Sequence, residues 1–172
     1  MKTIFQAMAK YNGNVNLEIM GLLGGMPPEK LAIKTKAYYS TIMDTALHIL
    51  LSDIGLFRRF KTSFPESKAL SIPLLNADTV LLKKEVEVGL EKYLQYRKVI
   101  DGMINEFVGE LDDAALVRSF KFTNYKGEPV ETIVWKMLLL IFNHQTHHRG
   151  ALSVMLELED VKNDFSGTLS RI

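Results

Sequence analysis

Apolar side chains recur at intervals of three and four along most of the chain, the spacing of one face of an α-helix. The first such pattern covers residues 4–23 and stops at Gly24-Gly25, before a pair of prolines that bars its continuation. The second covers roughly residues 36–60, with Tyr38 assigned to its core face. We therefore predict two long helices in the first third of the chain.

Two more helices are predicted further along. The third begins at Asn76 or Asp78, either of which can cap it, and continues to about Val108. Residues 117–123 then partly alternate apolar and polar side chains, as a strand does, and residues 124–127 can turn the chain into a second short strand. The last helix is predicted from residue 131 or 132 to residue 158.

Helices of about 20 to 30 residues are roughly 30–45 Å long, and four of them joined in sequence predict an antiparallel four-helix bundle. The fold class is thus all-α, with a long loop between helices two and three and a small hairpin-like insert before helix four. A chain of 172 residues is large enough to bury its own core, so we expect residues 1–172 to form a single domain.

Composition excludes several classes of protein. The net charge of +1, without a basic run, offers no electrostatic footprint for nucleic acid. Residues 1–10 lack the apolar run of a signal peptide, and no uninterrupted apolar stretch reaches membrane length. We therefore expect a cytoplasmic protein that binds neither nucleic acid nor membrane. Because the chain contains no cysteine, any thiol chemistry needs a thiol from outside.

Three of the four histidines lie in residues 143–150 of the last predicted helix. His144 and His148 are four residues apart, which places both rings on one face, within an otherwise apolar stripe. One metal ion would satisfy both rings, but two core histidines with separate hydrogen-bond partners fit the spacing as well. A third ligand would have to be His48, in the second helix.

The neighbours of these histidines are weaker candidates. His147 lies about 100° around the helix from His148, so we exclude it from the same coordination sphere. Arg149 is either an ion-pair partner near the site or a surface cation, and Gly150 suggests a close helix contact. Asp53, five residues beyond His48, can orient a ligand or act as a base, or it is an ordinary surface carboxylate.

The segment Asn143-His144-x-x-His147-His148-Arg149-Gly150 resembles the C-terminal signature of the DinB (DNA damage-inducible protein) family. The glutamine that usually follows the glycine is Ala151 here. The segment from His48 to Asp53 is similar to the family's helix-two motif. The resemblance implies a bundle in which His48, His144 and His148 face one metal, and it implies a homodimer.

The resemblance also suggests a reaction, because better-studied relatives use low-molecular-weight thiols. Three imidazoles suit zinc or nickel, while iron and manganese are compatible, and they leave a coordination position open. We expect a thiol S-transferase-like enzyme in which an external thiol attacks a small electrophile. The alternatives are a metal-assisted hydrolase and a non-catalytic metal-binding or dimerisation module.

Overall fold

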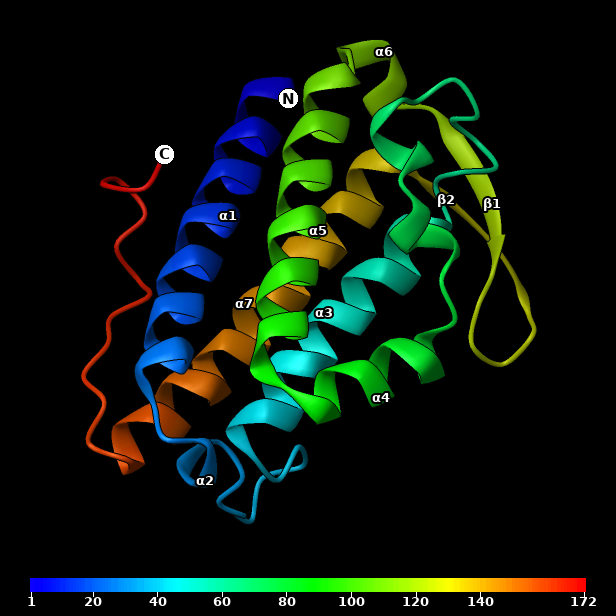
Figure 1. The fold of residues 1–172 in the computed structure, drawn as a ribbon. Coiled ribbons are helices and arrows are strands. Elements are labelled where there is room, and N and C mark those ends of the chain that lie inside the picture. Colours follow the sequence, from blue (N-terminus) through cyan, green and yellow to red (C-terminus); the bar gives the residue numbers. More distant parts are fainter.

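A computed structural model describes all residues from 1 to 172, and four long helices dominate it (Figure 1). These are α1 (Lys2–Gly25), α3 (Ile42–Arg58), α5 (Leu90–Glu110) and α7 (Val134–Leu158). The remaining elements are short: α2 (Pro28–Leu31), the 3-10 turns η1 (Ala69–Ser71) and η2 (Pro73–Asn76), α4 (Thr79–Val88), α6 (Asp113–Leu116), β1 (Ser119–Thr123) and β2 (Pro129–Ile133). The prediction of a mainly helical protein is confirmed.

The long helices pack against one another in a closed order. Helix α1 contacts α5 and α7, and α3 contacts the same two helices from the other side. Their apolar faces meet in one contiguous cluster of buried side chains. Each fully buried leucine or isoleucine in it contributes about 1.5–3 kcal/mol relative to an exposed one. No helix is both long enough and apolar enough to span a bilayer.

Helix α3 begins later than predicted. Its first residue is Ile42, because the Thr41 side chain caps the helix by accepting a hydrogen bond from the backbone N–H of Asp44 at 2.9 Å. Tyr38 therefore lies on the connection before the helix, where 92% of its surface is exposed. Its assignment to a core face was wrong.

The third predicted helix is broken in two. Asp78 caps α4 as expected, accepting from the N–H of Val80 at 2.8 Å. The chain leaves helical geometry at Gly89, which is extended with φ −173° and ψ 142°, and α5 starts at the next residue. A glycine in a helix interior is about 1 kcal/mol less favourable than an alanine, so the helix loses the least free energy when it is interrupted at this position.

The predicted hairpin is present. Strands β1 and β2 are antiparallel, with Phe120 opposite Thr132. The turn depends on Gly127, whose φ of 81° favours glycine, and on the Asn124 side chain, which accepts hydrogen bonds from two backbone N–H groups. Since residues 129–133 pair with β1, helix α7 begins at Val134, slightly later than the predicted start.

Candidate metal centre

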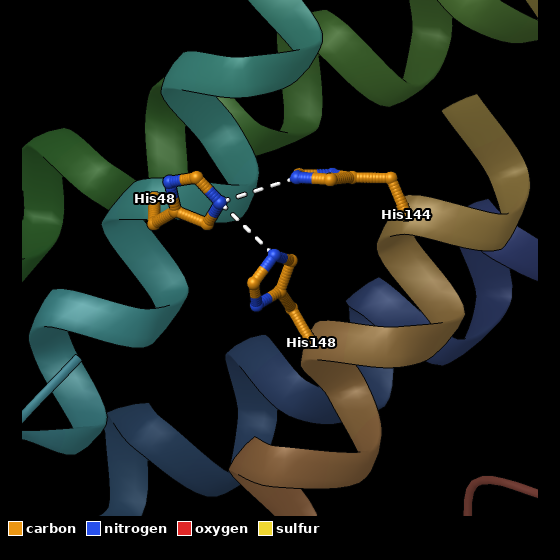
Figure 2. Close-up of side chains that lie close together, drawn as sticks. All are labelled: His48, His144 and His148. Atoms are coloured by element: carbon orange, nitrogen blue, oxygen red, sulfur yellow. Dashed lines mark hydrogen bonds between the residues drawn. The ribbon is translucent and has the colours of Figure 1, made fainter. Parts of the chain in front are cut away.

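Three imidazole rings from two facing helices converge on one point (Figure 2). His48 comes from the middle of α3, and His144 and His148 come from successive turns of α7. The Nε2 atom of His48 lies 3.2 Å from Nε2 of His144 and 3.1 Å from Nε2 of His148. The fold thus brings together all three histidines that the sequence singled out, and we refer to them as the three-histidine centre.

The geometry fits a metal ion better than it fits hydrogen bonds alone. A ring nitrogen carries either one hydrogen or one lone pair, so it makes only one well-formed hydrogen bond. Nε2 of His48, however, is within 3.2 Å of two other nitrogens. A metal at about 2.1 Å from each nitrogen, with angles between octahedral and tetrahedral values, would separate the nitrogens by about 3.0–3.4 Å. One nitrogen from each ring lies within 4.8 Å of the other two, so the group can hold one ion.

The protonation state of the rings also fits. Burial, reinforced by the neighbouring His144, lowers the pKa of His48 to about 4. Burial and the other histidines lower the pKa of His148 to about 4, and burial lowers the pKa of His144 as well. All three rings are therefore neutral at pH 7, the form that offers a lone pair to a metal.

The outer nitrogens of the rings are held loosely. Nδ1 of His48 lies 3.4 Å from the hydroxyl of Ser52, at the limit of a hydrogen bond. Nδ1 of His144 is buried and has no hydrogen-bond partner. Ring orientation therefore depends on packing more than on hydrogen bonds to the outer nitrogens.

Tyr39 covers the centre, although it was not among the residues predicted to form the site. Its ring stacks on His48, with centroids 4.0 Å apart and planes at 19°, and its edge meets His148 at 5.5 Å. Tyr39 lies on the irregular segment between α2 and α3, over which the predicted helix extended with Tyr38 instead of Tyr39 on its core face. Only its nearness in sequence to His48 could have drawn attention to it.

Asp53 is completely buried, so the interpretation as a surface carboxylate was wrong. Its carboxylate accepts a hydrogen bond from the Arg97 guanidinium at 2.6 Å and one from the Gln145 amide at 2.9 Å. Burial raises the pKa of Asp53, and the adjacent Arg97 opposes that rise. No hydrogen bond joins it to the three-histidine centre.

Asp53 belongs to a group of buried polar side chains that we call the buried polar layer. All four long helices contribute to it: Asn12 and Asn16 from α1, Asp53 from α3, Arg97 and Asp101 from α5, and Gln145 and Arg149 from α7. Its charges balance, with two guanidinium groups and two carboxylates. Burial raises the pKa of Asp101 and the guanidinium of Arg97, 2.7 Å away, opposes that rise, which leaves the pKa of Asp101 at about 6.

Arg149 belongs to this layer and is buried. Its guanidinium donates hydrogen bonds to Asn12 and, at 3.0 Å, to Gln145. The surface-cation alternative was therefore wrong. Gln145, which directly follows His144, was not among the predicted site residues. Its amide N–H donates to Asp53 and its carbonyl oxygen accepts from Arg149, so it connects these two members of the layer.

The other residues of the signature lie outside the centre. His147 is exposed and is not one of the three converging rings. Gly150 faces open space, because a Cβ there would meet nothing within 4 Å, so the predicted close helix contact was wrong. Ala151 borders a pocket beside His148.

The fold and the centre define a mainly helical protein with a three-imidazole metal-site geometry between two packed helices. The DinB family model matches residues 1–159, and the chain belongs to the DinB family. This family is metal-associated. No curated protein and no solved structure gives a match to the chain.

Proposed function

We propose that the protein is a metal-dependent enzyme that transfers a low-molecular-weight thiol to a small electrophile. His48, His144 and His148 are the proposed metal ligands. The observation that carries the proposal is the convergence of their Nε2 atoms, since that of His48 lies 3.2 Å from that of His144 and 3.1 Å from that of His148. Membership of a metal-associated family supports it.

The donor set favours particular metals. Three neutral imidazoles without a thiolate suit zinc or nickel, while iron and manganese are compatible. Such an ion, when bound, lowers the pKa of a thiol or water that occupies its open position. The chain has no cysteine, so a thiol that binds there comes from solution.

The surrounding residues hold the ligands and limit access of water. Tyr39 shields one side of His48 with its ring, which reduces the contact of that imidazole with solvent. We assign Asp53 a positioning role, because it is tied to Arg97 and Gln145 and does not touch the rings. Through Gln145 it fixes the turn of α7 that carries His144 relative to α3.

The broader arrangement forms part of the proposal. The closed order of contacts among α1, α5, α3 and α7 supports an antiparallel four-helix bundle, and the single apolar cluster supports one domain. Exposed apolar side chains on α7 support a homodimer: Leu139, Leu140, Val154 and Leu158. A mass of one chain in light scattering at micromolar concentration would contradict the homodimer.

Metal analysis of purified protein tests the site, and a thiol-transfer assay tests the reaction. The His48→Ala and His148→Ala variants should lose bound metal, whereas exposed His147→Ala should retain it. Metal-loaded protein should then accelerate the reaction of a small electrophile with cysteine, glutathione or bacillithiol over the metal-free protein. Acceleration of ester or amide hydrolysis alone would favour the hydrolase, and no acceleration of either reaction would favour a non-catalytic module.

A further inference from the structure

Two pockets open beside the three-histidine centre, and Tyr38 and Tyr39 line both of them, but only the ring of Tyr39 contacts the histidines. The His48 pocket has a volume of about 260 Å³ and is bounded by α3 and by Lys83 of α4. The His148 pocket has a volume of about 240 Å³ and is bounded by α7 and the start of α3. Because Tyr39 touches both His48 and His148, its ring stands between the two approaches to the centre.

The His48 pocket carries one group of each charge. Asp44 is exposed, and its carboxylate accepts only a 3.3 Å hydrogen bond from the Ser40 hydroxyl. Lys83 pairs with Glu87 at 3.8 Å, but both side chains are more than half exposed. Such a surface pair contributes little, so Lys83 is available to a ligand. A carboxylate from α3 and an ammonium from α4 that line the same pocket match a ligand that carries both an amino and a carboxylate group.

The His148 pocket has a different lining. It contains no acidic residue, lysine or arginine. Beside the imidazoles of His147 and His148, its own walls include Ala37, Ala151 and Met155. The hydroxyl of Thr45, also on its wall, is already bonded to the carbonyl of Thr41 at 3.0 Å. This pocket therefore suits an uncharged, apolar group. The small side chain of Ala151 keeps it open, because a longer side chain there would take up part of its volume.

We propose that Tyr39 divides the approach to the three-histidine centre into two substrate subsites. The His48 pocket binds the amino-acid end of a small thiol, and the His148 pocket binds the apolar group of the electrophile. This assignment rests on the proposed function. In the reaction the thiol sulfur loses its proton to solvent and forms a bond to the electrophilic carbon. The bond from that carbon to the leaving group breaks, and the leaving group departs with the electron pair.

Thiol binding can be followed without turnover in protein loaded with Co²⁺, since a thiolate that binds Co²⁺ adds a near-ultraviolet charge-transfer band. The probes are cysteine, cysteine methyl ester, which lacks the carboxylate, and 3-mercaptopropionate, which lacks the amine. Lys83→Met should weaken cysteine binding about five- to tenfold and leave the ester unchanged. Asp44→Asn should weaken cysteine binding similarly and leave 3-mercaptopropionate unchanged. Lys84→Met, next to Lys83 but outside the pocket, is the matched control and should change nothing.

The assignment of the His148 pocket to the electrophile is tested by substitutions of Ala151 and Tyr39. Ala151→Gln should lower kcat/KM for a bulky apolar electrophile about tenfold while the cysteine titration stays unchanged. Tyr39→Ala should join the subsites and reduce the preference for cysteine over its ester, whereas Tyr39→Phe should retain that preference. Metal content and circular dichroism of each variant establish that the centre and fold are intact.

The possible failures are distinguishable. If cysteine produces the band in the unaltered protein and neither Lys83→Met nor Asp44→Asn changes its affinity, the subsite assignment is overturned and thiol transfer stands. If no thiol produces the band in Co²⁺-loaded protein, the proposed thiol reaction itself is overturned. An equal loss of cysteine and ester binding in Lys83→Met would also contradict the assignment, because it would show that the carboxylate is not what Lys83 recognises.

Discussion

The carboxylate of Asp53 accepts hydrogen bonds from the Gln145 amide at 2.9 Å to each of its oxygens, and this contact joins α3 to α7 beside the three-histidine centre. Gln145 directly follows His144, and Asp53 lies little more than one helical turn beyond His48. The same pair of helices therefore carries the histidines and the buried contact that aligns them.

Removal of the Asp53 carboxylate should destabilise the protein strongly. In Asp53→Ala the guanidinium of Arg97 loses one of its two buried carboxylate partners, which costs about 3–5 kcal/mol. Urea denaturation measures this loss. Glu106→Ala, an acidic residue on the exposed face of α5, should change the free energy of unfolding by less than about 0.5 kcal/mol. Equal effects of the two substitutions would contradict a structural role for the buried pair.

Metal should stabilise the folded protein. An ion that binds only the folded state raises the free energy of unfolding by about 2.7 kcal/mol when its free concentration is 100 times Kd. A chelator should therefore lower the Tm of the metal-loaded protein and leave that of His148→Ala unchanged. A Tm that does not respond to chelator in the unaltered protein would argue against a metal held by the three histidines.

The two histidines with lowered pKa values should make the metal-free protein less stable in mild acid than it would be without them. The pKa values of His48 and His148 are lowered to about 4 from 6.5, so the unfolded chain takes up protons at a higher pH than the folded chain does. The contribution of these two rings to the stability of the folded state is therefore greatest above pH 6.5 and is lost as the pH drops toward 4. Because the rings are partly exposed, solvent screening limits the effect to about 2 kcal/mol.

Denaturation of metal-free protein at a series of pH values measures this slope. A variant with both His48→Gln and His148→Gln retains the carboxylates that also titrate in this range, so the difference between the two curves isolates the histidines. Parallel curves would show that these rings do not have lowered pKa values in the folded protein.

Two glycines should respond differently to alanine. Gly89 has an extended backbone that any residue adopts, and a Cβ there meets nothing within 4 Å. Gly89→Ala should change the free energy of unfolding by less than about 1 kcal/mol, because alanine restricts the unfolded chain but is a poorer N-cap than glycine at the start of α5. Gly127→Ala should destabilise it by about 1 kcal/mol, because φ there is 81°. The Tm values of the two variants, measured side by side, provide the test.

The local features of the fold were predictable from sequence, and the exceptions have identifiable causes. Helix α1 and the hairpin depend on local signals, a long apolar period and a turn formed by Asn124 and Gly127. The break at Gly89 was missed because apolar spacing continues on both sides of it. Tyr38 was assigned to the wrong environment because its spacing matches that of α3. The helix begins only after its N-cap, Thr41, and so does not include Tyr38.

The candidate site was predictable only where spacing indicates it. His144 and His148 are marked by their interval, His48 followed as the one histidine outside that segment, and the resemblance supported the set of three. The burial of Gln145, Arg97 and Arg149 depends on partners on other helices, so no local pattern distinguishes them from surface residues. Polar residues of this kind become recognisable as core residues only when the helices are packed.

The buried polar layer has a consequence for the way the helices can slide. Apolar side chains tolerate exchange of neighbours, whereas a guanidinium must meet a carboxylate at hydrogen-bond distance. A slip of one turn between α3 and α7 would move Asp53 about 5.4 Å from Gln145, and it would separate His48 from His144 by a similar step. We expect the buried polar layer to prevent α3 from sliding along α7. The distance between the imidazoles is then set by hydrogen bonds in which no histidine takes part.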